Sequence, residues 1–186
     1  MSEKSEIEEI MESAVLRKRG QGYHDFQVGE EIHHHWGRTI TEADAIQFAH
    51  LTLAYNPLYF NREYAKELGH PDIVVCPQLV FNVILGLSVE ICSEGLGGPF
   101  LGVYDLKYLE PVYPGDTLTA RSKTEAMRES ESSEGRGIVT WFNEGFNQHG
   151  DKVIEYRRSN LAIWKGAMGS PKIKSCLLYT SDAADE

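Results

Sequence analysis

The stretch Leu53-Ala-Tyr-Asn-Pro-Leu-Tyr-Phe-Asn61 lies at the end of an amphipathic run and decides how the fold is interpreted. Its Asn56-Pro57 pair is predicted to end the preceding helix, because the residue before a proline is driven out of the α region. Two interpretations remain open from these residues alone. Asn56 and Tyr59 either take part in chemistry, or they preserve the shape of a site whose chemistry is done elsewhere.

The sequence before this stretch predicts one strand and one helix. Residues 23–36 are predicted to be an extended segment that leads into a first strand. Thr41-Glu-Ala-Asp44 is a helix-start pattern, in which the first and fourth side chains satisfy free backbone N–H groups. The apolar side of that helix is predicted to consist of Ile46, Phe48, Ala49, Leu51 and Leu53.

After the stretch, the pattern changes from helices to long strands. A short helix is predicted over residues 61–68. A buried helix is predicted from Cys76 to Ile91, since apolar residues cover nearly all of its faces. Four strand-like segments follow, at residues 100–109, 117–127, 137–147 and 152–164. A buried helix followed by antiparallel strands predicts an α+β fold in which a sheet wraps around a long central helix.

Composition excludes several classes of protein. The chain has 186 residues, a net charge of −10 and a pI of about 5.2, which fits one acidic globular domain. This charge argues against binding to nucleic acids or to anionic membranes. The apolar runs are too short to span a bilayer, and the first residues lack the apolar core of a secretory signal. Three cysteines without metal spacing or an even disulfide framework predict a cytoplasmic protein.

The two ends of the chain differ from the middle. Residues 1–21 are predicted to be an amphipathic N-terminal arm, and residues 22–166 a single domain. Residues 167–186 are predicted to be a linker and a non-native tail. From Cys176 onward this tail resembles translated sequencing-adapter DNA, which predicts a metagenomic gene whose native protein continues further; a native disordered tail is the alternative.

Residues 22–165 resemble the MaoC-like dehydratases, a hotdog-fold family that acts on coenzyme A thioesters. Besides Asn56-Pro57, the resemblance is carried by Phe26-Gln-Val-Gly-Glu-Glu31, Gly37-Arg-Thr-Ile-Thr-Glu-Ala-Asp44, Val112-Tyr-Pro-Gly-Asp-Thr-Leu118 and Gly145-Phe-Asn-Gln148. Within the family, residues 79–86 and 153–157 are most similar to the mesaconyl-CoA hydratase (methylmalyl-CoA dehydratase) branch and its itaconyl-CoA hydratase relatives. Members of the first branch often hold two hotdogs in one chain.

The resemblance implies an enzyme that adds or removes water across the double bond of an enoyl-CoA, such as mesaconyl-CoA or a related short branched thioester. The family pattern is Asp-x-Asn-Pro-x-His, whose carboxylate and imidazole share one water. Here the Asp position is Ala54 and the His position is Tyr59, and a phenol with a pKa near ~10 is a poor base at neutral pH. Pro77 stands where the family uses an N–H for the enolate oxygen, and proline has none.

The site that this resemblance predicts contains two catalytic candidates. These are Asn56 and Tyr59, the latter as a proton donor or carbonyl clamp, or else as a pocket-lining aromatic. The expected cofactors are none beyond coenzyme A as part of the substrate, and no metal is expected. The expected partner is a second copy in a homodimer or a second hotdog domain. The predicted substrate contacts are Ala54, Tyr55, Pro57, Cys76, Pro77 and Gln78.

The histidines have both functional and structural interpretations. His50 lies one helical turn before Ala54 and can turn toward the vacated site, or it is an ordinary surface or partly buried histidine. His33-His34-His35 cannot easily share one metal ion, because successive strand residues point to opposite faces.

The other charged candidates are mainly structural. Asp44 is expected to cap a helix and Asp116 to serve in a turn. Arg157 and Arg158 lie on a late strand, from which they can face the coenzyme phosphates as an alternative to a structural role.

The residues leave three functional hypotheses open. The chain is a hydratase with an altered active site, or a non-catalytic hotdog that shapes the acyl-CoA pocket for a catalytic partner, or an acyl-CoA binding protein without turnover. The resemblance over residues 22–165 favours the first hypothesis. The residues at positions Ala54, Tyr59 and Pro77 favour the second.

Overall fold

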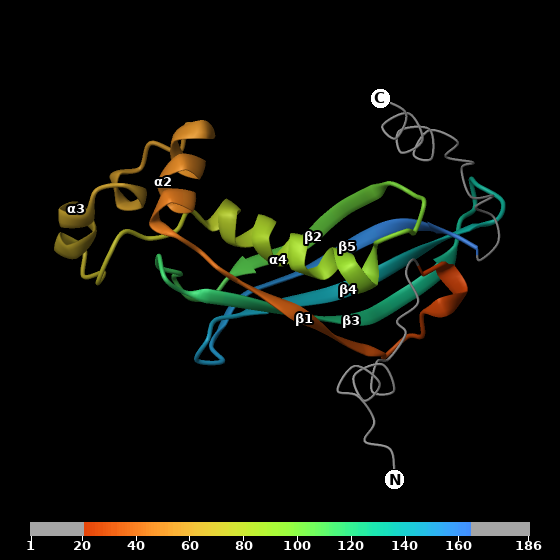
Figure 1. The fold of residues 1–186 in the computed structure, drawn as a ribbon. Coiled ribbons are helices and arrows are strands. Elements are labelled where there is room, and N and C mark those ends of the chain that lie inside the picture. Colours follow the sequence, from red (N-terminus) through yellow and green to blue (C-terminus); the bar gives the residue numbers. More distant parts are fainter. Residues whose placement is uncertain (1–20, 165–186) are drawn as a thin grey trace, which may run out of the picture.

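The structure is a computed structural model that describes residues 21–164, and most of the predicted arm and all of the predicted tail lie outside them. Five antiparallel strands form one sheet in the order β1-β3-β4-β5-β2. Helix α4 lies across one face of the sheet, and the shorter helices α2 and α3 lie beyond its N-terminal end (Figure 1). The predicted α+β arrangement is confirmed. The elements are η1 (Tyr23–Asp25), β1 (Glu31–Thr39), α2 (Glu42–Leu51), η2 (Pro57–Tyr59), α3 (Arg62–Glu67), α4 (Pro77–Cys92), β2 (Phe100–Tyr108), β3 (Thr117–Glu129), β4 (Arg136–Phe146) and β5 (Lys152–Ile163).

Helix α2 begins where the sequence predicts but ends earlier. The Asp44 N–H donates to Thr41 Oγ1 at 3.1 Å and the Thr41 N–H donates to Asp44 Oδ2 at 3.0 Å, so Asp44 caps the helix as expected. The helix ends at Leu51 instead of at Asn56-Pro57, because Leu53 adopts a left-handed φ of 56°. Leu51 and Leu53 are 84% and 66% exposed, so their predicted place on the buried side is wrong.

The first predicted segment is only partly extended. Tyr23–Asp25 forms a 3-10 turn, because the Asp25 carboxylate accepts a hydrogen bond from the Gly22 N–H at 2.9 Å. Strand β1 begins at Glu31 and continues to Thr39, beyond the predicted limit. The prediction of an extended segment over all of 23–36 is therefore wrong at its N-terminal end.

Helix α4 supplies one side of the core. Pro77 occupies its first position, where a backbone N–H would have no partner within the helix, so its absence does not destabilise the helix. The helix packs on β1, β3 and β4. The prediction that it is buried on nearly all faces is wrong for one stripe, formed by Asn82, Gly86 and Val89, which no described element covers. None of the helices within residues 21–164 combines the length and apolar character needed to cross a membrane.

The inner face of the sheet, which faces α4, supplies the other side of the core. One inner row pairs Ala120 with Gly145 and Gly145 with Ile154 across β3, β4 and β5. A Cβ at Gly145 would come within 2.6 Å of Ile84 and Ile154, so glycine is required for the helix to approach. Tyr156 and Trp141 are fully buried in the neighbouring rows. This packing fixes where the N-terminal end of α4 lies.

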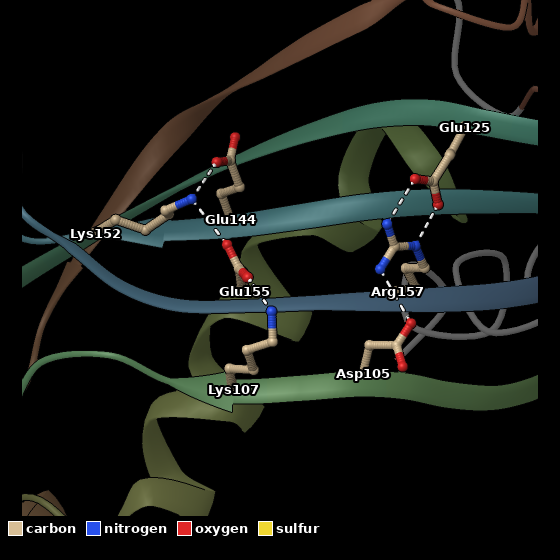
Figure 2. A network of polar contacts seen from close by, with 7 residues as sticks. All are labelled: Asp105, Lys107, Glu125, Glu144, Lys152, Glu155 and Arg157. Atoms are coloured by element: carbon tan, nitrogen blue, oxygen red, sulfur yellow. Dashed lines mark hydrogen bonds and ion pairs between the residues drawn. The ribbon is translucent and has the colours of Figure 1, made fainter.

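The outer face of the sheet carries a ladder of ion pairs (Figure 2). Lys107 Nζ donates to Glu155 Oε1 at 2.9 Å. Lys152 Nζ donates to Glu155 at 2.8 Å and to Glu144 at 3.0 Å. The ladder therefore links β2, β5 and β4 side by side.

Arg157 and Arg158 lie on opposite faces of the sheet. Arg157 pairs with Glu125 at 2.6 Å and with Asp105 at 3.0 Å on the outer face (Figure 2). Arg158 is 1% exposed on the inner face, where it donates to the carbonyl oxygen of Ser88 at 3.0 Å. The suggestion that both face coenzyme phosphates is wrong, because neighbouring strand residues point in opposite directions.

Candidate functional site

The stretch 53–61 forms a turn that is bonded to the start of α4. Asn56 Oδ1 accepts a hydrogen bond from the Leu58 N–H at 3.1 Å and so caps η2, whose first residue is Pro57. The Val74 N–H donates to the Leu58 carbonyl at 3.0 Å, which joins the turn to the chain that enters α4. In this structure Asn56 preserves the turn and brings Tyr59 near the start of α4.

The first turn of α4 has few free backbone donors. The Cys76 thiol is 1% exposed and donates to Gln78 Oε1 at 2.8 Å. Pro77 has no N–H, and the N–H groups of Leu79 and Val80 point to the Cys76 carbonyl at 2.9 and 3.4 Å. Within residues 21–164, the Gln78 N–H is the first-turn donor that has no partner. One backbone donor thus remains at the positive end of the helix.

An apolar cavity of about 230 Å³ adjoins this turn. Backbone hydrogen bonds hold its walls together: Val75 N–H to Val112 O at 2.8 Å, and Leu109 N–H to Val153 O at 2.9 Å. Two lining side chains, Tyr108 and Glu110, carry polar groups. The other lining residues are Val74, Val75, Pro77, Val80, Leu109, Pro111, Val112 and Val153.

Tyr59, Cys76 and Tyr108 form one electrostatic group beside the cavity. Burial, and then the nearby Cys76 thiol, raises the pKa of Tyr59. Burial raises the pKa of Tyr108 as well, with Cys76 and Tyr59 adding to the effect. Both phenols therefore stay protonated at neutral pH. They can donate a hydrogen bond or a proton, but they cannot serve as the base that activates water.

The remaining predicted site residues do not supply that base. Ala54 is half-buried and offers only a methyl group, and Tyr55 is 65% exposed. The ring of His50 lies 5.5 Å from that of Phe60, so the histidine is held by an aromatic contact. Of the predicted residues, the structure thus brings Tyr59, Cys76, Pro77 and Gln78 together at one end of α4.

Sequence reasoning missed Tyr108 and Glu110. Tyr108 is the last residue of β2 and Glu110 follows it, just before Pro111-Val112. The alternation of apolar and polar residues in this strand does not predict whether these two side chains are buried. The signal that points to them is their position beside Val112, where a segment of the family resemblance begins. Only the cavity that this segment lines together with Pro77 and Val80 shows that it lies beside α4.

The histidine run does not form a metal site. His34 is buried, with Nε2 at 2.8 Å from Ser122 Oγ, whereas His35 Nδ1 lies 3.1 Å from Glu90 and His33 is exposed. In the part of the chain that the structure describes, no group of three or more His, Cys, Asp or Glu side chains is placed to hold a metal ion.

Comparisons with known proteins agree with this architecture. A mesaconyl-CoA hydratase of Haloarcula hispanica is 30% identical over 162 residues, which cover 87% of this chain and 45% of that protein. A solved protein of Chloroflexus aurantiacus, described as a MaoC domain dehydratase, is 29% identical with a TM-score of 0.74 and covers 82% of this chain and 43% of its own. A Mycobacterium tuberculosis structure described as a double hotdog fold is 19% identical, with a TM-score of 0.67, and supports the fold alone.

The matches cover most of this chain but less than half of the longer relatives. The chain spans less than half the length of the curated Haloarcula relative and of the Chloroflexus structure. The family model of the mesaconyl-CoA hydratases matches residues 2–170, which is nearly the whole chain. The chain therefore belongs to the mesaconyl-CoA hydratase family and has the hotdog fold.

Proposed function

We propose that this chain is a hotdog unit of an acyl-CoA hydratase or dehydratase, which adds or removes water across the double bond of an enoyl-CoA. The proposed substrate is mesaconyl-CoA or a related short branched acyl thioester. The observation that carries the proposal is the apolar cavity at the start of α4, which Tyr108 lines and to which Tyr59 is an electrostatic neighbour, in a chain that matches the family over residues 2–170. A cavity of about 230 Å³ favours a short acyl group.

The chemistry requires three kinds of group. Hydration bonds the hydroxide of a water to the β carbon and a proton to the α carbon, so it needs a base, an acid and donors to the thioester oxygen. In this proposal the hydroxyls of Tyr59 and Tyr108 and the N–H of Gln78 are the donors. Glu110 lines the cavity and is the carboxylate that would take the proton from water.

A second candidate function is that of a supporting hotdog, which shapes the acyl pocket while another hotdog activates the water. Ala54 and Tyr59, in place of the family's carboxylate and imidazole, favour this candidate, as does Pro77 at the oxyanion position. The greater length of the curated relatives also supports it, because it leaves room for a second unit. If no other hotdog activates the water, this second candidate becomes a protein that binds a thioester without turning it over.

Turnover assays distinguish the two candidates. Purified chain is mixed with mesaconyl-CoA, itaconyl-CoA or crotonyl-CoA. Hydration is monitored by chromatography, or by the loss of the ultraviolet absorbance of the double bond where that bond is conjugated with the thioester. If this unit is catalytic, Glu110→Gln and Tyr59→Phe each lower kcat by ~10²-fold or more. The control Glu134→Gln, at an exposed hairpin tip, leaves kcat unchanged.

The remaining outcomes are also decisive. Saturable binding of a thioester without turnover would favour the supporting unit over the catalytic one. Neither binding nor turnover with all three thioesters would contradict both candidates.

The setting of the reaction is proposed on the same basis. Coenzyme A takes part as a portion of the substrate, and we propose no separate cofactor. A cytoplasmic location is supported by Cys76 and Cys92, which are free thiols. We also propose that the unit works with a second hotdog, either a further copy of this chain or another domain.

A further inference from the structure

A second cavity, of about 590 Å³, adjoins the apolar one. The two cavities share Glu110 and Pro111 as lining residues, so they lie on either side of this short segment. The remaining lining residues of the second cavity all carry polar side chains: Tyr113, Asp116, Asn147, His149, Asp151 and Lys152. Water needs polar partners, which the apolar cavity hardly offers, so this polar cavity is the hydrated side of Glu110.

Glu110 is the free carboxylate between the two cavities. It is exposed, and among residues 21–164 its side chain has neither a cation nor a hydrogen-bond donor as a partner. The other carboxylates of the polar cavity are held in place. Asp116 accepts a hydrogen bond from the Tyr113 N–H at 2.8 Å. Asp151 accepts one from the Asn147 amide at 3.1 Å. Since bound donors favour the charged form of a carboxylate, Glu110 is the carboxylate that takes up a proton most readily.

Lys152 and Tyr113 keep the protons that they carry. Hydrogen bonds to Glu155 and then to Glu144 raise the pKa of Lys152 (Figure 2). Burial is the main cause that raises the pKa of Tyr113. Neither side chain can therefore accept a proton at neutral pH, and His149 is the remaining group of the polar cavity that can.

Hydrogen bonds orient the ring of His149, which is exposed to solvent. The Thr117 N–H donates to Gln148 Oε1 at 2.9 Å, which fixes the direction of that amide. The amide Nε2 then donates to Asp116 Oδ1 at 2.7 Å and faces His149 Nε2 at 3.1 Å. In the neutral ring Nε2 is thus the nitrogen that can take up a proton, and Nδ1–H can pass one on. The amide stays in place when its contact with the ring opens, because its other two bonds remain.

We propose that the polar cavity delivers water to Glu110 and that His149 carries the proton of this water away to solvent. This inference deepens the proposed hydration and rests on it. Glu110 takes one proton from water as the hydroxide bonds to the β carbon. The proton passes through water in the polar cavity to His149 Nε2, and one proton leaves from Nδ1. The α carbon receives its proton from the phenol of Tyr59 or Tyr108, which regains one from solvent, so the protons balance.

Removing the imidazole tests the proposal. His149→Ala is expected to fold, because the turn depends on the His149 backbone N–H, which donates to Asn147 Oδ1 at 2.9 Å. Circular dichroism checks this. With a thioester that the wild type hydrates, kcat is expected to fall ~10-fold or more, and KM to change by less than about twofold. The matched control is His33→Ala, at an exposed histidine of β1, and it leaves both constants unchanged.

Chemical rescue separates proton transfer from a structural effect. Imidazole added to the buffer is expected to restore the rate of His149→Ala in proportion to its concentration and to leave the wild-type rate unchanged. A lost contact in the turn would not respond to a small base. Hydration that His149→Ala leaves unchanged, or that it slows without rescue by imidazole, would overturn this inference alone. No hydration by the wild type with any of the three thioesters would contradict the catalytic function itself, and this proton route with it.

Discussion

His34 is an ionisable side chain that the fold keeps neutral. It lies on β1 and is 7% exposed, and its Nε2 is 2.8 Å from Ser122 Oγ on β3 and 3.9 Å from Cys92 Sγ on α4. Burial lowers the pKa of His34 from 6.5 to about 4, and the nearby Arg158 guanidinium adds to this effect. Protonating the imidazole would place a second positive charge beside a buried arginine, which the folded state resists.

The stability of the chain is expected to fall as pH drops from 6.5 toward 4. In this pH window His34 is protonated in the unfolded chain but stays neutral in the folded chain. The free energy of unfolding therefore decreases by roughly 2–3 kcal/mol. Urea unfolding at several pH values measures the slope. The variant His34→Gln should flatten the slope between pH 6.5 and about 5, where carboxylates contribute less, and the exposed His33→Gln should keep it. An unchanged slope in His34→Gln would contradict this account.

Individual residues were predictable where chemistry is local. Thr41 and Asp44 form a capping box in any chain context, because their partners are three residues away. The opposite case is Tyr108. Nothing near it in the sequence indicates that the end of its strand lies beside the start of α4, because that depends on pairing with residues more than forty positions later. The role of Asn56 and Tyr59 in catalysis stays a prediction.

At the scale of elements, the outer-face ladder links strands that are otherwise joined by backbone hydrogen bonds. Glu144 accepts hydrogen bonds from Arg121 at 2.9 Å and from Lys152 at 3.0 Å (Figure 2 shows the latter). Its side chain is 14% exposed, so the pairs are partly shielded from water. Burial acts to raise the pKa of Glu144, but the hydrogen bonds from Arg121 and Lys152 outweigh it and hold the pKa below its ordinary value.

Removing the charge of Glu144 is expected to destabilise the sheet. Glu144→Gln leaves Arg121 and Lys152 without their shared carboxylate and should cost about 1–2 kcal/mol in the free energy of unfolding at neutral pH. The control Glu31→Gln removes a 52% exposed carboxylate that lies 3.9 Å from Lys123, and it should change stability by less than about 0.5 kcal/mol.

The cost of Glu144→Gln should shrink in acid. The carboxylate's contribution is present above the ordinary pKa of glutamate and is lost as pH falls through its lowered folded value. Chemical denaturation at neutral and acidic pH measures both variants. Equal costs for the two substitutions at neutral pH would show that the ladder adds no more than a surface ion pair.

Elements were predictable in kind but less so in extent. The long strands and α4 follow from apolar pattern and turn residues, and their predicted ranges agree with the structure to within a few residues. Helix α2 does not follow its pattern to the proline, because Leu53, two residues after the helix ends at Leu51, adopts a left-handed conformation. The left-handed residue closes the helix locally, because the Leu53 N–H donates to His50 O at 3.2 Å and the Ala54 N–H donates to Ala49 O at 2.8 Å. Glycine or asparagine usually takes this position, so a leucine there gives no sequence signal.

For the whole molecule, the family resemblance predicts the hotdog fold, and the structure and the comparisons confirm it. Strand β2 is an edge strand of the sheet, although along the chain it lies between helix α4 and the strands β3, β4 and β5. The edge position of β2 depends on its long-range pairing with β5, which local sequence patterns do not encode. The exposed stripe on α4 has the same origin, because the exposure of its residues depends on which elements lie next to them in space.

The central claim is that the cavity at the start of α4 holds the acyl group of a coenzyme A thioester. The most direct measurement is equilibrium binding of mesaconyl-CoA, by titration calorimetry, to the wild type and to Leu109→Trp, which replaces a lining residue of the cavity by a bulkier one. The account predicts saturable binding that is tighter than that of free coenzyme A. It also predicts a loss of about tenfold or more in Leu109→Trp, and no loss in Leu68→Trp, an exposed control at the C-terminal end of α3 that does not line the cavity. Equal affinity for mesaconyl-CoA and free coenzyme A, or an unchanged affinity in folded Leu109→Trp, would contradict it.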